Sequence, residues 1–580
     1  MGKGMMNTNS IQTKSIISMI IIYPILFIFQ GMDITDTGFY LTSYQQIFTA
    51  PRNLRYEFLY WLSDVIGGVW LNLFGNLGYI GIRLAWVFII WGVIFCYYKI
   101  LNKYMDKQIL LIGFFVVLIF TSNTVHTLDY NILTTLFFEL GSGLLFYGII
   151  KDKNRLIFSG GFVLGTSIFL RLPNLVGFTL MMAVLYYGFL KRTAFRSQFI
   201  QCLYFVIGYL MSIALIIVLM KLIGHLDYYL DSLKFLTQIG ESPKATHGIG
   251  NLIGLFFHNY SNVIKFTAIY GIIIIGASIL ITPFLNNRRF YKCICLFVFL
   301  LSIVLWNRYY SFEVNKDCIY AMNGFMDIIL VLYIFNVFKM EKEFRLIALF
   351  GLLILTLTPL GSDNGIYNSI FGMWLSGVIL IWTTFKLDQF IQIKNSSLKS
   401  NLKNFNRLIG IVFIAFCLVQ GYRYTYRDSV NRLSMKYTVN NKYLKGIVTT
   451  KGRARVLNEL LNETRKYVKK NEKLLAYSDL QLIYYLTETR PYLYTSFQRA
   501  YNDDKFIATL REAEKENKVL PTIIIQTVDT KDRNWPRLDN ELFIKNMKES
   551  TRYKTIKNFM RRHSYKLKWS NRCFQIWNGI

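Results

Sequence analysis

The sequence predicts a polytopic α-helical membrane protein of about thirteen membrane-spanning helices, followed by a C-terminal α/β domain. Three observations lead to this fold class. The chain of 580 residues is 53% hydrophobic. Apolar runs recur along roughly the first 420 residues, and many of them are long enough to span about 30 Å of hydrocarbon. A soluble chain of this length would instead divide into several domains with polar surfaces.

Thirteen apolar runs are candidate membrane spans. The first follows Lys3 and Lys14, and no small-residue cleavage site comes after it, so we interpret it as a retained helix and not as a removed signal peptide. The candidate spans cover residues 15–30, 80–98, 109–121, 131–150, 156–170, 174–190, 199–223, 266–285, 291–306, 320–338, 346–360, 366–385 and 408–421.

The distribution of basic residues predicts the orientation of these spans. With a cytoplasmic N-terminus, the inside segments hold 22 Lys and Arg, against 8 in the outside segments before residue 421. Such a bias sets membrane topology. We therefore predict a multi-pass protein of the cell inner (cytoplasmic) membrane. Residues 1–421 form its transmembrane domain, and an odd number of spans places residues 422–580 on the extracytoplasmic side.

The formal net charge of +31 does not indicate a nucleic-acid partner. The basic residues occur as small clusters between apolar runs and as a spread over the C-terminal part, which is typical of membrane topology and of contact with anionic lipid headgroups. Seven scattered cysteines form no disulfide framework. The histidines lack the spacing of zinc ligands, and all five fall on the predicted outer side: His126, His225, His247, His258 and His563.

The C-terminal part alternates strand and helix patterns, which favours a parallel or mixed sheet. We predict strands at 473–478, 491–496 and 521–528. Between them lie a helix at 479–489 that begins with an Asp cap and an exposed helix at 503–518.

Two long outer loops stand out. The first outer loop, residues 31–79, contains two aromatic, amphipathic stretches at 41–48 and 56–74, which are typical of interfacial helices. The second, residues 224–265, contains "GESPKATHGIGN", and its glycines and small polar residues predict a mobile segment. Such a loop could cover a substrate or serve only as a connector.

Asp33 and Asp36 lie at the predicted outer end of the first span, in "MDITDTGFY". Arg83 lies just inside the second span, where a charge needs a partner. The partner of Arg83 could be a substrate phosphate, or Arg83 could form a structural ion pair with Asp64 or Glu57.

The order of these features is similar to that of GT-C-fold glycosyltransferases, in particular the protein O-mannosyltransferases and the lipid A aminoarabinose transferase. Asp36 to Tyr40, "DTGFY", resembles their D-E-x-x-Y motif, with Thr in place of Glu. "RYEFLYWL" at 55–62 occupies the position of a lysine-proline-proline-leucine segment, without the prolines. "LFGN" at 73–76 and Arg83-Leu84 resemble the FG and RL that follow.

Three further segments resemble the same family. "HTLDYNILTTLFFEL" at 126–140 places Asp129 at the acidic position before the fourth span. "LGTSIFLRLPNLVGF" at 164–178 resembles a Gly-rich span that ends in a basic residue, here Arg171. "YYLTETRPYLYTSF" at 484–497 resembles a segment of the external domains of bacterial members.

The resemblance implies transfer of a sugar from a polyprenyl-phosphate-linked donor to a glycan, lipid or protein acceptor at the outer membrane face. It implies Asp36 as the general base, with Asp33 orienting it. Asp129 is a second acidic position, and the three aspartates could together hold a divalent cation. Positive charge would stabilise the departing phosphate, and the candidates are Arg83, Arg171, Arg52 and Arg55.

Other interpretations stay open at this point. Asp36 could be a helix cap or a solvated loop residue, and Arg171 could extend to the interface. The rival functions are a polysaccharide polymerase or ligase, a lipid-linked glycan transporter or flippase, and a non-catalytic scaffold. A transporter would favour internal repeats and charges at mid-membrane, which the sequence does not display.

Overall fold

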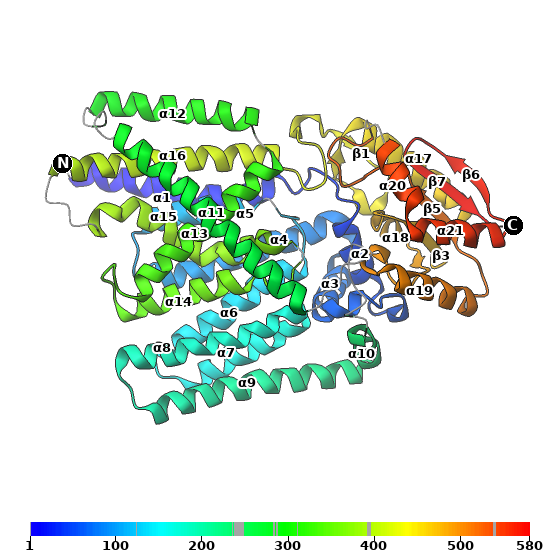
Figure 1. Cartoon of the computed structure of the whole chain (residues 1–580), viewed down its shortest axis with the longest axis horizontal. Coiled ribbons are helices and arrows are strands. Elements are labelled where there is room, and N and C mark those ends of the chain that lie inside the picture. Colours follow the sequence, from blue (N-terminus) through cyan, green and yellow to red (C-terminus); the bar gives the residue numbers. More distant parts are fainter. Residues whose placement is uncertain are drawn as a thin grey trace.

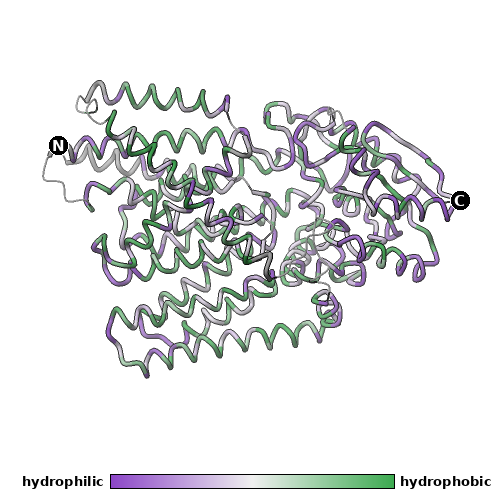
Figure 2. Tube along the Cα trace, in the orientation of Figure 1, coloured by the Kyte–Doolittle hydropathy of each residue, from purple (hydrophilic) through white to green (hydrophobic). Residues whose placement is uncertain are grey.

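The molecule consists of a bundle of long helices and an α/β part that lies at one end of the bundle (Figure 1). Figure 2 shows long hydrophobic stretches along the bundle and a more mixed pattern in the α/β part. The computed structural model describes residues 2–122, 124–234, 236, 249–281, 285, 288–309, 311–362, 364–390, 396–536 and 541–579.

Every one of the thirteen predicted apolar runs overlaps a helix of the bundle. These helices are α1 (Gly2–Leu26), α4 (Gly78–Leu101), α5 (Lys107–Thr121), α6 (Tyr130–Ile150), α7 (Asn154–Thr166), α8 (Met182–Lys191), α9 (Phe195–Leu222), α11 (Ile249–Ile281), α12 (Arg288–Tyr309), α13 (Phe312–Ile334), α14 (Lys342–Leu357), α15 (Met373–Phe390) and α16 (Ser396–Arg423).

Nine helical segments of the described residues are long and apolar enough to cross a membrane. The chain is therefore a polytopic helical membrane protein, while the count of thirteen spans stays a prediction. The apolar parts of α1 and α5 are shorter, at Gln12–Leu26 and Lys107–Thr121. Large apolar side chains on α9 and α11 point outward, such as Leu222 and Ile272, as expected for a surface that contacts lipid.

Glycines bring the helices of the bundle close together. A Cβ at Gly161 of α7 would lie 2.2 Å from the carbonyl oxygen of Phe205 in α9, and one at Gly208 would lie 2.1 Å from that of Phe158. Small residues at such crossings let helix backbones approach closely in a membrane.

The first outer loop is largely helical and largely buried. It forms α2 (Asp36–Gln46), short 3₁₀ turns and α3 (Trp61–Phe74). The predicted helix at 56–74 is thus present. The predicted stretch at 41–48 covers the second half of α2 and the two residues after it. The side chains of α2 are nearly all buried and α18 packs against this helix, so the predicted position at the lipid interface is not found for residues 41–46, whereas Phe48 is exposed.

The central part of the second outer loop cannot be compared with its prediction. Residues 226–234 form α10 (Leu226–Lys234), and α11 begins at Ile249. The predicted mobile segment and His247 lie for the most part in 237–248, outside the described residues.

The α/β part contains a mixed five-stranded sheet with the strand order β4-β3-β5-β7-β6. β3 pairs in parallel with β4 and β5, whereas β7 runs antiparallel to β5 and β6. The strands are β3 (Lys473–Tyr477), β4 (Arg490–Pro491), β5 (Thr522–Gln526), β6 (Lys566–Ser570) and β7 (Phe574–Asn578). The helices are α17 (Lys451–Tyr467), α18 (Leu482–Thr487), α19 (Asp503–Glu516), α20 (Glu541–Glu549) and α21 (Thr551–Arg562).

The sequence predicted the bounds of β3, β5 and α19 closely, but it overestimated the length of one strand. The predicted strand at 491–496 is reduced to the two residues of β4. The chain turns directly after it, where Tyr494 has a left-handed φ of 55°. β4 is an edge strand, where a proline such as Pro491 is tolerated. The predicted helix at 479–489 shortens to α18.

The α/β part is joined to the first outer loop by main-chain contacts. The Leu482 amide at the start of α18 donates to the carbonyl of Ile34 at 2.9 Å, and the Arg55 amide donates to the carbonyl of Tyr494 at 2.8 Å. In addition, a two-stranded sheet, β1 (Tyr437–Thr438) with β2 (Val448–Thr449), continues into a parallel bridge between Val448 and Gln30.

Gly38 is the point of closest approach between α2 and the α/β part. A Cβ at this position would lie 2.1 Å from the backbone nitrogen of Leu482. Because the obstacle is backbone and not a movable side chain, any larger residue forces α18 away from α2.

We predict that Gly38→Ala destabilises the protein by about 1–3 kcal/mol, the usual cost of overpacking. It should also increase protease cleavage between α16 and α17. Thermal unfolding of the detergent-solubilised full chain and limited proteolysis measure the two effects. Gly75→Ala is the matched control, because a Cβ there meets open space. Equal melting temperatures for Gly38→Ala and wild type would contradict this packing.

Candidate functional site

Asp36 and Arg427 form the centre of the candidate site. Asp36 is the first residue of α2, and Arg427 lies in the segment that joins α16 to the α/β part. Arg427 Nη1 is 2.8 Å from Asp36 Oδ1, and the Tyr426 hydroxyl donates to Asp36 Oδ2. The Asp36 side chain is 26% exposed, which leaves this carboxylate accessible from solvent.

Asp33 shapes the turn that precedes α2. Its Oδ1 accepts from the Thr35 amide at 3.0 Å, and its Oδ2 accepts from the Thr37 amide at 2.6 Å. Arg427 lies 3.8 Å from the same carboxylate. Burial raises the pKa of Asp33, while the charge of Arg427 opposes this rise. Asp33 therefore positions Asp36 through the backbone of the turn.

The joining segment is held by a buried ion pair directly after Arg427. Arg453 Nη1 lies 2.9 Å from Asp428 Oδ1, and both side chains are almost completely buried. Arg453 Nη1 also donates to the carbonyl of Arg427 at 2.8 Å. Arg427 itself has a left-handed φ of 50°, a strained conformation for a residue with a side chain. These contacts keep it there and aim its guanidinium at Asp36.

Asp129 and Arg171 lie near a group of packed tyrosines. Tyr60 and Tyr130 stack with ring centroids 4.3 Å apart, and the Tyr40 ring lies 5.8 Å from that of Tyr130. Asp129 caps α6, because its Oδ1 accepts from the amides of Asn131 and Ile132, each at 2.8 Å.

Burial raises the pKa of Asp129 to about 7. The cap hydrogen bonds and the charge of Arg171 oppose this rise, and the charge of Asp36 adds to it. Burial lowers the pKa of Arg171, and the neighbouring Tyr130, Tyr60 and Asp129 oppose this fall. Asp129 thus lies within electrostatic reach of both Asp36 and Arg171.

Arg83 is occupied by the end of the first helix. Its Nη1 donates to the carbonyls of Ile28 and Gln30 at 2.6 and 3.1 Å, and its Nη2 donates to that of Gly31 at 2.9 Å. Neither Asp64 nor Glu57 is its partner in these contacts. The predicted phosphate role of Arg83 is not supported, because its guanidinium satisfies backbone carbonyls that follow α1.

Arg171 also donates hydrogen bonds to neighbouring segments of the protein. Its Nε donates to Asn174 Oδ1 at 2.9 Å, and its Nη2 donates to the carbonyl of Thr358 at 2.6 Å. The Arg171 side chain is buried, so it does not extend to the membrane interface, which was the alternative to a phosphate contact. It faces Asp129 and the tyrosines from inside the bundle.

Arg52 and Arg55 bind the α/β part and are not directed at a phosphate site. Arg55 forms a two-pronged ion pair with Glu512, at 2.7 and 2.6 Å, and stacks on the Tyr494 ring. Arg52 lies 2.8 Å from Glu516. Both glutamates lie on α19, so these two arginines help to attach the α/β part to the loop.

The three aspartates do not form a metal site. Within the described ranges, no group of three or more His, Cys, Asp or Glu side chains could hold a metal ion. Both oxygens of Asp33 and one oxygen of Asp129 already accept from backbone amides. The predicted cation site of Asp33, Asp36 and Asp129 is therefore not supported by the donor arrangement.

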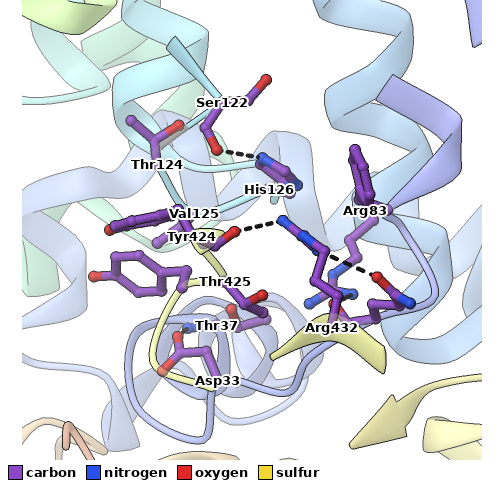
Figure 3. Close-up of a pocket in the computed structure, with 13 residues that line it drawn as sticks. Asp33, Thr37, Arg83, Ser122, Thr124, Val125, His126, Tyr424, Thr425 and Arg432 are labelled. Carbon is purple, nitrogen blue, oxygen red and sulfur yellow. Dashed lines mark hydrogen bonds between the residues drawn. The ribbon is translucent and has the colours of Figure 1, made fainter. Parts of the chain in front are cut away.

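A small cavity lies beside Asp33, between the ends of α1, α4 and α5 (Figure 3). Its free volume is about 20 Å³, which is room for about one water molecule. His126 lines it, stacks on Trp86 and bonds to the carbonyl of Ser122. Burial, with the charges of Arg83 and Arg432, lowers the pKa of His126 to about 3. Tyr426, whose hydroxyl donates to Asp36, also lines this cavity, which is too small to hold a sugar.

Sequence reasoning missed Tyr426 and Arg427. The available signal was "GYRYTYRD" at 421–428, in which tyrosines and arginines alternate directly after the last span. No motif connects this segment with Asp36, from which Tyr426 is separated by 390 positions. The chain matches no model of a known protein family and no curated protein.

The raised pKa of Asp129 predicts a pH-dependent stability. The folded protein retains a proton that the unfolded chain releases near pH 4, so the free energy of unfolding should fall as pH rises from about 4 to about 7. The slope contributed by this residue approaches about 1.4 kcal/mol per pH unit. Asp129→Asn keeps the cap and should make the dependence shallower in thermal unfolding. The exposed Asp504→Asn is the control. Identical slopes for Asp129→Asn and wild type would refute the assignment.

Proposed function

We propose that this chain is a membrane glycosyltransferase that moves a sugar from a polyprenyl-phosphate-linked donor to an acceptor hydroxyl, with Asp36 as the general base. The observation that supports it best is the accessible carboxylate of Asp36, held by Arg427 and Tyr426 where the bundle meets the α/β part. The similarity of the first outer loop to GT-C enzymes agrees with this assignment.

The chemistry needs a base, an accessible anomeric carbon and a stabilised leaving group. The acceptor oxygen forms a bond to the anomeric carbon while its proton passes to Asp36. The bond between that carbon and the phosphate oxygen breaks, and the polyprenyl phosphate leaves with the electron pair. Asp33 contributes by fixing the turn from which Asp36 projects.

Arg427 is the cation best placed for the leaving phosphate. In the structure it pairs with Asp36, so an incoming donor phosphate competes with the carboxylate for the guanidinium. When Arg427 shifts towards the phosphate, Asp36 loses its ion-pair partner and becomes a stronger base. Arg171 adds positive charge from the bundle side, beyond Tyr60 and Tyr130.

The site's location suits a lipid-linked substrate. It lies at the end of the bundle nearest the α/β part (Figure 1), where a polyprenyl tail could stay in hydrocarbon while its phosphate reaches the headgroup level. With thirteen spans and a cytoplasmic N-terminus, this end and residues 422–580 face the outside of the inner membrane. The acceptor could be a glycan, a lipid or a protein.

Replacing Asp36 by Asn should lower sugar transfer by about 10²–10⁴-fold, the usual contribution of a general base. The assay uses proteoliposomes and radiolabelled glucose, mannose, N-acetylglucosamine or aminoarabinose linked to polyprenyl phosphate. Asp504→Asn removes an exposed carboxylate and should leave the rate unchanged. Transfer by Asp36→Asn near the native rate would eliminate the base assignment. Movement of intact donor across the bilayer without transfer would favour a flippase, and polymer-length products would favour a polymerase.

Binding of polyprenyl phosphate itself tests the role of Arg427. Arg427→Gln should weaken binding by about tenfold or more, because a hydrogen bond to a charged group contributes about 1.5–3 kcal/mol. Arg427→Lys should retain part of the affinity. Asp36→Asn should tighten binding, since the competing carboxylate is gone. Arg55→Gln is the control, because Arg55 is paired with Glu512. Unchanged affinity in Arg427→Gln, measured by calorimetry, would exclude this phosphate contact.

A further inference from the structure

A basic groove lies on the α/β part, far from Asp36. It runs along α21 and the neighbouring strands β6 and β7 and has a volume of about 740 Å³, within the range of about 300–1,000 Å³ typical of ligand sites. We call it the α21 groove. Its basic lining residues are Lys548, Lys554, Lys557, Arg561 and Lys566.

The charge in this groove is uncompensated by its own lining. Among the described residues, none that lines it is acidic. Lys554, Lys557 and Arg561 follow one another at i, i+3 and i+7, which places them on one face of α21. Burial and the neighbouring charges of Arg561 and Lys548 lower the pKa of Lys557. An anion in the groove would relieve this repulsion.

The row of charges suits an extended polymer better than a single small anion. With a rise of about 1.5 Å per residue, the three side chains follow each other at intervals of about 5 Å along the helix. Tyr553, Tyr565 and Trp577 form apolar walls beside them. The groove therefore offers repeated cationic contacts next to surfaces that can pack against carbon–hydrogen groups.

The position of the groove separates it from the membrane. Figure 1 shows α21 and β6 near the end of the molecule opposite to the bundle, close to the C-terminus. A lipid headgroup in the membrane that holds the bundle does not reach this end. The Lys557 ammonium lies 4.1 Å from the Trp577 ring centroid, so a cation already occupies one face of the indole that a stacking base would use.

We infer that the α21 groove binds an acidic glycan, a sugar polymer with repeated carboxylate or phosphate groups. The choice of a glycan among polyanions rests on the proposed function, because a sugar-transferring enzyme with a glycan acceptor would have the growing polymer beside it. The groove would then hold the acceptor chain while its end reaches Asp36. Lys566 and Lys568 on the edge strand β6 also discourage pairing with other strands, but this does not account for the row on α21.

The test measures binding of fluorescein-labelled polygalacturonate to the full chain in phosphatidylcholine nanodiscs. We expect binding that weakens as salt rises, as for other multi-site charge contacts. The triple variant K554Q/K557Q/R561Q should bind about tenfold more weakly or worse. The triple variant K469Q/K515Q/K518Q removes the same charge from exposed positions elsewhere and should bind as wild type does. K557R should retain binding.

Competition identifies the ligand class. Methyl-esterified polygalacturonate, which has the same backbone without charge, should not compete, whereas a glycerol-phosphate polymer should. Wild-type affinity in K554Q/K557Q/R561Q with a native melting temperature would overturn the inference. Tighter binding of oligo-dT, or of anionic lipid vesicles, than of polygalacturonate would also overturn it. Asp36→Asn should leave polygalacturonate binding intact. A loss of sugar transfer can therefore be distinguished from a loss of binding in the α21 groove.

Discussion

The candidate site depends on one buried ion pair, between Arg453 of α17 and Asp428 of the joining segment. Charges removed from water this completely are tolerated only when their remaining hydrogen-bonding capacity is also satisfied, and removing one partner usually costs about 3–5 kcal/mol. This hydrogen-bonding requirement is met for both side chains. Asp428 accepts from the Met32 amide and from the Thr449 hydroxyl, each at 2.7 Å. Arg453 also donates to carbonyls of the neighbouring chain, namely Arg427, Asp532, Arg533 and Trp535. The pair thereby joins the first outer loop, the joining segment and the α/β part.

The arginines of this region divide into two groups by the chemistry of their partners. Arg83 and Arg432 donate chiefly to backbone carbonyls where helices end or chain segments turn, and Arg171 donates to one such carbonyl and to the Asn174 side chain. Such carbonyls have no partner within their helix and are expensive to bury alone. Arg427, in contrast, binds carboxylates. A cation held by a carboxylate can exchange it for a phosphate, whereas one held by several carbonyls supports the fold. This difference explains why Arg427, and not Arg83, is the better candidate for the donor.

Sequence patterns predicted the helices well because burial in a membrane requires long apolar runs with few charges. The strands β3 and β5 were predicted for a similar reason, since buried parallel strands are almost uniformly apolar. The same patterns singled out Asp36 and Asp129 as charged residues close to apolar runs. They could not locate Arg427, because its partner is nearly four hundred residues away. They also could not show that Arg52 and Arg55 pair with α19, whose glutamates are indistinguishable from ordinary surface residues.

The bridge between Gln30 and Val448 carries a consequence for how the protein is made. The residues that leave α1 bond to β2, with the Gly31 amide on the Val448 carbonyl and the Val448 amide on the carbonyl of Phe29. The Met32 amide likewise donates to Asp428, which follows 396 positions later in the chain. During synthesis, the turn that carries Asp36 is among the first segments to emerge from the ribosome and among the last to find its partners. A nascent chain released before β2 therefore lacks the contacts that hold the turn carrying Asp36.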